Sequence, residues 1–301
     1  MTAAAPAIAA AQQNRGTLFV EDATVTGIEA FPGDQFILRL NAPETAASAV
    51  PGSFIHVQCD AAIPMRRPLS IMRANAEDGW IEILFKTVGS GLHALGNRMP
   101  GDIVNLIGPI GRGFKAAPER PLTLLIGGGV GIPPMVFLAE YLQDDEYDWQ
   151  PLVIMGSEIP FPFQLVRSAL DTPWLADDLV STMPLLETWQ IPARLASLQG
   201  YEGCFRGYVT DLAREWLNTL SADKLAGVEI FSCGPTPMLR AVAALAREFN
   251  VPCQVSLEEF MACAVGGCAG CAVLVETEEG PAMKRVCVDG PVFGAAAVFL
   301  E

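Results

Sequence analysis

Four cysteines near the C-terminus have the residue type and the spacing of a metal-cluster site. They are Cys263, Cys268, Cys271 and Cys287, and their pattern is C-x4-C-x2-C-x15-C. Three closely spaced thiolates and one distant thiolate are typical of a plant-type [2Fe–2S] cluster. Such a cluster carries one electron at a time, so the pattern predicts a role in electron transfer.

The glycines between these ligands suit the same prediction. Gly266, Gly267 and Gly270 allow the loop to wrap tightly and to turn backbone N–H groups towards sulfur. Four cysteines can also hold a structural zinc ion, but zinc ligands usually occur as two short pairs. Here three cysteines share one loop and the fourth is separate, which favours the iron–sulfur cluster over zinc.

Composition limits the classes of protein that fit. The 301 residues suggest two domains and a small extra module. The net charge of −15, with only 19 Lys and Arg, argues against a nucleic-acid partner. Cluster ligands must stay reduced, which predicts a cytoplasmic location. Residues 1–15 are rich in alanine and lack a basic segment, so we expect a disordered tail and no signal peptide.

One uncharged stretch, residues 121–139, is long enough to cross a bilayer. It contains Gly127-Gly128-Gly129, Gly131 and Pro133-Pro134 in its middle, and a lipid-exposed helix with these breakers could not satisfy its backbone. We therefore expect a buried strand, a glycine loop and a buried helix, and no membrane span.

The chemistry-bearing residues must be positioned by three units. Residues 16–118 hold short β-rich runs between Pro-Gly and Asp-Gly turns, which predicts an antiparallel barrel. Residues 119–254 alternate strands with helices, which predicts an α/β domain with a parallel sheet. Residues 255–301 form the cysteine module. The helices expected in the second unit are 134–142, 163–170, 209–220 and 236–249. Within 179–205 the sequence first resembles a strand and then, from 185 to 198, more a helix.

Two motifs suit anionic cofactors. Arg67 in R-P-L-S can bind a phosphate with its planar guanidinium group, and Ser70 can hydrogen-bond a cofactor ring. Alone this motif is weak, because an exposed arginine and a strand serine with no cofactor explain it better. The second motif is the loop of Gly127, Gly128, Gly129 and Gly131, between a strand and a helix, where backbone amides can meet a pyrophosphate. The alternative is a tight packing turn.

Cys233 follows the strand 228–232 and precedes a helix. Ligands of open parallel sheets bind at the carboxyl ends of strands, so Cys233 is a candidate catalytic residue beside a nicotinamide. A single cysteine at a strand end is otherwise buried packing.

In this order, the motifs at 67–70, 127–135 and 232–239 and the C-terminal cysteines resemble the ferredoxin reductase superfamily. More narrowly, SLEEFMACAVGGCAGC and RVCVDGPVF, together with GYVTDL, are similar to the electron-transfer subunits of NAD-dependent dihydroorotate dehydrogenases. The resemblance covers nearly the whole chain.

The resemblance implies FAD on the barrel, with its pyrophosphate at Arg67, and NAD(H) over the second domain near the glycine loop and Cys233. Electrons would pass between NAD(H), FAD and the [2Fe–2S] cluster. The partner would be an FMN-containing dihydroorotate dehydrogenase catalytic subunit in a heterotetramer, and the pathway pyrimidine biosynthesis. The residues that the resemblance assigns to FAD are Arg67, Pro68, Leu69, Ser70, Leu84, Phe85, Lys86, Gly91 and Leu92.

The chain departs from the family pattern at three places. Gly91-Leu92 stands where Gly-Thr is usual, Phe260 replaces an arginine, and residues 179–205 differ, which affects the ribose contacts. Two alternatives therefore stay open. One is an oxidoreductase of the same build that serves a hydrogenase, a transhydrogenase or a pyrimidine-degrading enzyme. The other is a non-catalytic binding protein held together by zinc.

Overall fold

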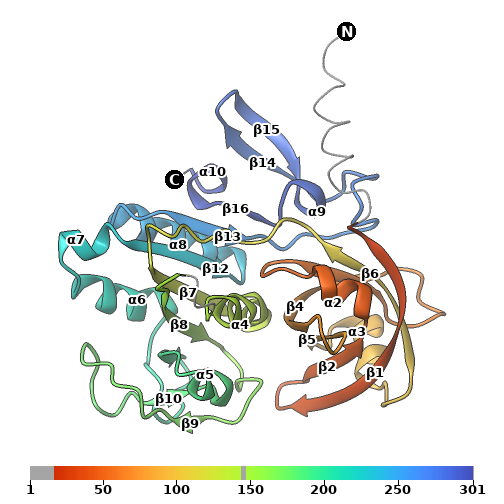
Figure 1. The fold of residues 1–301 in the computed structure, drawn as a ribbon, viewed down its shortest axis with the longest axis horizontal. Coiled ribbons are helices and arrows are strands. Elements are labelled where there is room, and N and C mark those ends of the chain that lie inside the picture. The colour runs from red at the N-terminus through yellow and green to blue at the C-terminus, as the bar shows by residue number, and fades with distance from the viewer. Residues whose placement is uncertain (1–16, 144–146, 301) are drawn as a thin grey trace.

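The first unit is a closed barrel of six antiparallel strands in the order β1-β2-β5-β4-β3-β6 (Figure 1). In this computed structural model, residues 17–143 and 147–300 are described, so the tail predicted for 1–15 lies outside them. The barrel strands are β1 (Phe19–Phe31), β2 (Gln35–Asn41), β3 (Phe54–Gln58), β4 (Arg67–Asn75), β5 (Trp80–Lys86) and β6 (Ile103–Ile110), with helices α2 (Pro43–Ser48) and α3 (Gly89–Gly96). The predicted barrel is confirmed.

The side chains of β3 point alternately to the barrel core and to the cysteine module. Ile55 and Val57 are fully buried in the barrel core. Phe54 belongs to a different cluster, which it shares with residues of the cysteine module. Successive side chains of a strand point to opposite faces, so His56 lies on the same outer face as Phe54. The outer face of β3 is thus covered by the cysteine module.

The second unit is built on a six-stranded sheet in the order β11-β8-β7-β12-β13-β16 (Figure 1). The first five strands are parallel, as predicted, and β16 is antiparallel to β13. The elements are β7 (Leu122–Gly128), a 3-10 turn (Gly129–Gly131), α4 (Ile132–Tyr141), β8 (Gln150–Gly156), β9 (Val166–Arg167), β10 (Ser181–Thr182), α5 (Pro184–Thr188), β11 (Ala193–Ala196), α6 (Val209–Asn218), α7 (Ala222–Leu225), β12 (Val228–Cys233), α8 (Thr236–Glu248) and β13 (Cys253–Ser256).

The uncharged stretch 121–139 forms β7, the glycine turn and most of α4, as expected. Helix α4 is buried on all sides from Ile132 to Ala139. Its residues share a cluster with Met72 and Leu84 of the barrel, which explains why the helix lacks a polar face. No described helix has the length and apolarity needed to cross a membrane.

Two expected helices are wrong. Residues 163–170 form a loop with the short strand β9, because the N–H groups of Ser168 and Ala169 donate to the Val180 carbonyl and to the Glu187 carboxylate instead of to a helix. In the unclear region, α5 covers only 184–188. Residues 193–196 form β11 instead of a helix. Pro192 would interrupt a helix at this point, and all four residues pair with β8.

The cysteine module leaves the sheet after β13 and returns to it through β16 (Val292–Gly294). Val255 pairs with Phe293 across these two strands. Between them lie the cluster loop and a hairpin, which extends away from both larger units (Figure 1). The remaining elements are β14 (Ala272–Thr277), β15 (Gly280–Arg285), α9 (Val286–Asp289) and α10 (Ala295–Val298).

Candidate functional site

The four predicted cluster cysteines lie in two pairs. The sulfur atoms of Cys271 and Cys287 are 3.4 Å apart, and the backbone N–H of Cys268 lies 3.4 Å from the sulfur of Cys263. In the described part of the chain, no three His, Cys, Asp or Glu side chains converge on one point as single-metal ligands would. A [2Fe–2S] cluster needs two thiolates on each of two irons. The pairing of the cysteines fits that donor set.

Backbone amides surround the sulfurs. Burial acts to raise the pKa of Cys263, but N–H groups of Val265, Cys268 and Gly267 outweigh it and lower this pKa to about 7. The N–H of Gly270 likewise lies 3.4 Å from the sulfur of Cys268. Donors aimed at sulfur stabilise thiolates and tune the reduction potential of a bound cluster.

The loop obtains this geometry from left-handed backbone. Gly266 has a φ of 81°, and the non-glycine residues Ala264 and Ala269 have φ of 55° and 53°. A side chain at Gly266 would meet Val288 at 2.6 Å. Left-handed conformations of residues other than glycine are uncommon and concentrate at functional loops. The backbone of residues 263–271 is therefore already shaped to hold a cluster, and we call this loop the cluster cradle.

The cradle has a buried side and an exposed side. Cys271 and Cys287 are buried in a cluster with Phe54 and Ile110 of the barrel, whereas Cys268 is exposed. Burial and the neighbouring Cys271 raise the pKa of Cys287 to about 12 in the metal-free chain. One pair thus faces the barrel, and Cys268 of the other pair is exposed at the protein surface.

Arg67 and the first turn of α3 form the candidate phosphate site on the barrel. The guanidinium of Arg67 lies 3.5 Å from the position that a Cβ on Gly91 would occupy. Its hydrogen bonds go to the carbonyls of Met65 and Arg66, and no described carboxylate forms an ion pair with it. Among the residues that the structure describes, no side chain caps the N-terminus of α3. An uncompensated guanidinium beside free helix N–H groups suits a phosphate anion.

The other residues assigned to FAD divide into two groups. Pro68, Leu69 and Ser70 are half-buried on β4, as are Lys86 and Leu92 on their own elements. The side chains of Leu84 and Phe85 are buried in core clusters. A contact of Leu84 or Phe85 with a cofactor would therefore come from the backbone.

The glycine turn and Cys233 are brought together at the carboxyl edge of the sheet. Cys233 pairs with Gly127, and a Cβ on Gly131 would lie 2.3 Å from the Cys233 carbonyl oxygen. A Cβ on Gly128 would meet the sulfur of Met238 at 2.5 Å, whereas Gly129, at φ 54°, has no atom within 4 Å of its Cβ position. The turn is packed closely from behind and open at Gly129.

The thiol of Cys233 is almost completely buried, with 1% of its surface exposed. Burial, followed by the charge of Glu258, raises its pKa far above the usual range. The thiol is therefore neutral at pH 7, and any role beside a nicotinamide would be that of a neutral contact.

Comparison with known proteins decides the family. Residues 258–299 match the family model of the iron–sulfur cluster binding domain of dihydroorotate dehydrogenase B. The chain is 31% identical over 291 residues to the dihydroorotate dehydrogenase B (NAD(+)) electron transfer subunit of Desulforamulus reducens, covering 94% of this chain and 99% of the relative. It is 34% identical over 254 residues to that of Bacillus caldolyticus, covering 83% and 87%. The chain belongs to this family of electron transfer subunits.

Solved structures of reductases share the fold of this electron transfer subunit. An NADH-dependent reduced ferredoxin-NADP oxidoreductase superposes with a TM-score of 0.74 at 25% identity, covering 92% of this chain and 90% of that one. A ferredoxin reductase of carbazole 1,9a-dioxygenase has the same fold at 22% identity and a TM-score of 0.54, covering 77% and 65%. The subunit is an oxidoreductase component, and family and fold together support FAD, a [2Fe–2S] cluster and NAD(H) as its cofactors.

One residue at the centre of this electron transfer subunit was not predicted. His56 is 1% exposed on the outer face of β3, and in the described structure neither ring nitrogen has a partner with full hydrogen-bond geometry, although backbone groups of Met261 and Arg66 lie near the ring and partly offset the shift of its pKa. Burial and the charge of Arg66 lower its pKa to about 4. The alternation in SFIHVQC could have placed His56 opposite Ile55 and Val57, but only the fold shows what covers it.

Proposed function

We propose that this subunit transfers electrons between NAD(H) and an FMN-containing dihydroorotate dehydrogenase catalytic subunit, by way of FAD and the [2Fe–2S] cluster. The observation that carries the proposal is the placement of the cluster cradle. Its buried cysteines pack on the barrel, and its exposed cysteine lies at the surface. A one-electron carrier between an internal flavin and an external acceptor requires this arrangement.

The barrel connects the two candidate sites directly. Ser70 on the R-P-L-S strand pairs with Phe54 on β3, and Phe54 belongs to the same buried cluster as Cys271 and Cys287. Two adjacent strands therefore separate the proposed flavin position from the buried pair of cluster ligands. This short connection supports electron transfer within one chain.

The residues of the chain would divide the work as follows. Arg67 and the α3 N-terminus would hold the FAD pyrophosphate, and the open side of the glycine turn at Gly129 would admit the NAD(H) pyrophosphate. Met238 and Cys233 close the back of that turn, so the dinucleotide would lie across the carboxyl edge of the sheet. When bound, flavin accepts a hydride and releases electrons singly, and the cluster carries them one at a time.

The surface beside the cluster suits a protein partner. Phe260 is 95% exposed and Val265 is 49% exposed, and both flank the first cluster ligand in sequence. Large apolar side chains at such exposure are typical of interaction sites. We propose that this surface docks the catalytic subunit, with the apolar Phe260 in place of the arginine usual in the family.

A coupled assay tests the docking. The chain alone should reduce a one-electron acceptor with NADH and be inert with dihydroorotate, and adding the catalytic subunit should produce NAD-linked dihydroorotate oxidation. Ala269→Trp and Phe260→Asp should abolish this coupled turnover while leaving the NADH-driven reduction of FAD intact. Met99→Trp, at a methionine that is 67% exposed and lies between α3 and β6 of the barrel, is the control and should couple normally.

Each outcome has a defined meaning. Dihydroorotate oxidation by the isolated chain would contradict the accessory role. Normal coupling in both variants, with the cluster absorbance intact, would show that the partner docks elsewhere. The likeness to the NADH-dependent ferredoxin-NADP oxidoreductase favours one second candidate, a flavin and iron–sulfur reductase for another partner. Co-purification of a native partner without a pyrimidine site would support that candidate.

We also propose that the assembly is a cytoplasmic heterotetramer. None of the eight cysteines forms a disulfide, including the four that are not predicted cluster ligands, Cys59, Cys204, Cys233 and Cys253. Free thiols are usual in a reducing compartment. The mass of the complex reconstituted with its catalytic subunit, measured by light scattering, tests the stoichiometry. A stable complex of one copy of each chain would contradict it.

A further inference from the structure

A cavity lies at the edge of the parallel sheet opposite the glycine turn. It is lined by Leu122 and Gln150, the first residues of β7 and β8, and by Pro192 immediately before β11. These are the amino ends of three neighbouring strands, whereas the nucleotide loop and Cys233 lie at the carboxyl ends. The volume of the cavity is about 680 Å³, within the range of small-molecule sites. The proposed electron path does not use it.

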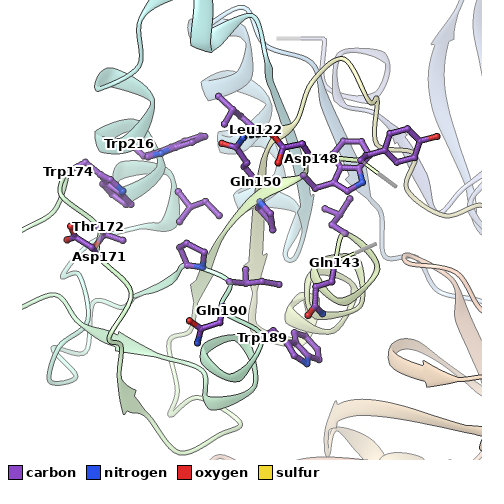
Figure 2. Close-up of a pocket in the computed structure, with 17 residues that line it drawn as sticks. Leu122, Gln143, Asp148, Gln150, Asp171, Thr172, Trp174, Trp189, Gln190 and Trp216 are labelled. Atoms are coloured by element: carbon purple, nitrogen blue, oxygen red, sulfur yellow. Dashed lines mark hydrogen bonds between the residues drawn. The ribbon is translucent and has the colours of Figure 1, made fainter. Parts of the chain in front are cut away.

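The cavity gathers tryptophan. The chain contains five tryptophans, and Trp149, Trp174, Trp189 and Trp216 all line this cavity. They come from four separate segments, and the labelled rings of Trp174, Trp189 and Trp216 surround the space in Figure 2. Trp174 and Trp189 are half-buried, so part of each indole remains accessible. All four also pack against the core clusters of the domain, and the cavity is bounded by the parts of the indole rings that this packing leaves accessible.

The charge of the lining selects the ligand. Asp148 and Asp171 line the cavity, and none of the described lining residues is Lys, Arg or His. The buried Arg194 behind the wall interacts with the charge of Asp171, but the lining itself presents only carboxylates, which disfavours phosphates and carboxylates as occupants. Indole rings and carboxylates together attract cations that carry an apolar surface. Arg73 already lies 5.2 Å from the ring centre of Trp189, its charge balanced by Glu140 at 2.6 Å.

The wall that carries Asp171 and Trp174 is held in place. Arg194 is 3% exposed and donates to the Leu170 carbonyl and the Thr172 hydroxyl, both at 2.7 Å. The carboxylate of Glu187, two residues before Trp189, accepts from the hydroxyl of Ser168 at 2.8 Å and from the N–H of Ala169 at 2.7 Å. These bonds join the loop to β11 and α5. The cavity is therefore formed before any ligand arrives.

We infer that this tryptophan-lined cavity binds a small organic cation of the alkylated ammonium class. The cationic head would lie against the indole of Trp174 with Asp171 nearby, and its apolar part would extend towards Leu122 and Leu152. Such a ligand would bind at the amino ends of the strands, whereas the nucleotide turn lies at their carboxyl ends. The cavity would therefore be an effector or accessory site and not part of the reaction.

Calorimetric titration of the complete, cofactor-loaded protein with choline tests the inference, with quenching of tryptophan fluorescence as a second readout. Choline should bind saturably, whereas its neutral isostere 3,3-dimethylbutan-1-ol should bind at least about fivefold more weakly. Asp171→Asn should weaken choline binding by about fivefold, and Trp174→Leu by about tenfold. Asp177→Asn, at an exposed residue of the same loop outside the lining, is the matched control.

Asp171→Asn should leave NADH-driven acceptor reduction at the wild-type rate, which also shows that the variant is folded. Equal binding of choline and the neutral alcohol would overturn the inference, as would unchanged affinity in both pocket variants. Competition by NAD⁺ would place choline in the nucleotide site and overturn it too. Binding of an arginine-rich peptide without binding of choline would assign the cavity to a protein partner instead.

Discussion

Replacement of Arg67 by alanine is the sharpest test of the flavin site. The guanidinium hydrogen-bonds only backbone carbonyls and lies against the first turn of α3 at Gly91. Because no described carboxylate pairs with it, its removal leaves no buried charge behind. We therefore expect Arg67→Ala to change the free energy of unfolding by less than about 0.5 kcal/mol, as a surface substitution does.

The effect on FAD should be much larger. A charge-assisted hydrogen bond to phosphate contributes about 1.5–3 kcal/mol. This corresponds to a loss of FAD affinity of about tenfold to about 150-fold. Arg67→Lys keeps the charge but loses the planar two-point contact, so it should recover only part of the affinity.

The assay is titration of the deflavinated protein with FAD, followed by quenching of flavin fluorescence, with a thermal melt of each variant. Arg112→Ala removes an exposed arginine after β6 and serves as the control. Wild-type affinity in Arg67→Ala would refute the phosphate role. A lowered melting temperature in the FAD-free variant would show that Arg67 is structural.

Three further outcomes follow from the sites. Cys268→Ser, like a change of any other cluster ligand, should remove the visible absorbance and the reduced-state EPR signal, and stoichiometric zinc without labile sulfide would contradict the cluster. Gly129→Val should block the bleaching of the flavin by NADH, because the valine fills the open side of the turn. Cys233→Ala should slow the bleaching while FAD stays bound. Wild-type rates in both variants would show that NAD(H) binds elsewhere. Burial lowers the pKa of His56 from 6.5 to about 4. Between pH 6.5 and pH 4 the imidazole is therefore protonated in the unfolded chain but neutral in the folded one. The free energy of unfolding should fall by up to about 3 kcal/mol as the pH drops through this range. Urea melts of His56→Phe should lack this part of the pH dependence, and an unchanged slope would refute it.

Local patterns were enough for the parts of the protein that depend on local chemistry. The cysteine spacing predicted an iron–sulfur module, which the family match over 258–299 supports, and the strand–glycine–helix pattern placed the turn at residues 127–131. These signals work because a ligand loop or a helix start is specified by its own residues. The helix expected over 163–170 failed because the apolar spacing there comes from Phe163 and Leu165 packing against the core, while the backbone is held by a distant carboxylate.

Long-range contacts were beyond the sequence. Nothing near His56 indicates that the cysteine module covers it, and nothing near Trp174 indicates that three other tryptophans share its cavity. The approach of Arg67 to Gly91 was implied only by family resemblance, because the two residues lie on separate elements of the barrel. Such juxtapositions depend on how β-strands and loops from distant segments are assembled.

The pairing of β13 with β16 has a consequence for how the cysteine module could be gained or lost. The chain leaves the sheet at Ser256 and re-enters it at Val292, and these two residues are direct cross-strand partners. The whole cluster-bearing segment is thus inserted between two points that are already adjacent, as in a hairpin with a very long loop. Closing such a loop costs little more than closing a moderate one, because the entropy grows only with the logarithm of length. A flavin reductase could therefore acquire or lose its one-electron outlet by a single insertion or deletion at this hairpin, without rebuilding the sheet that binds the nucleotide.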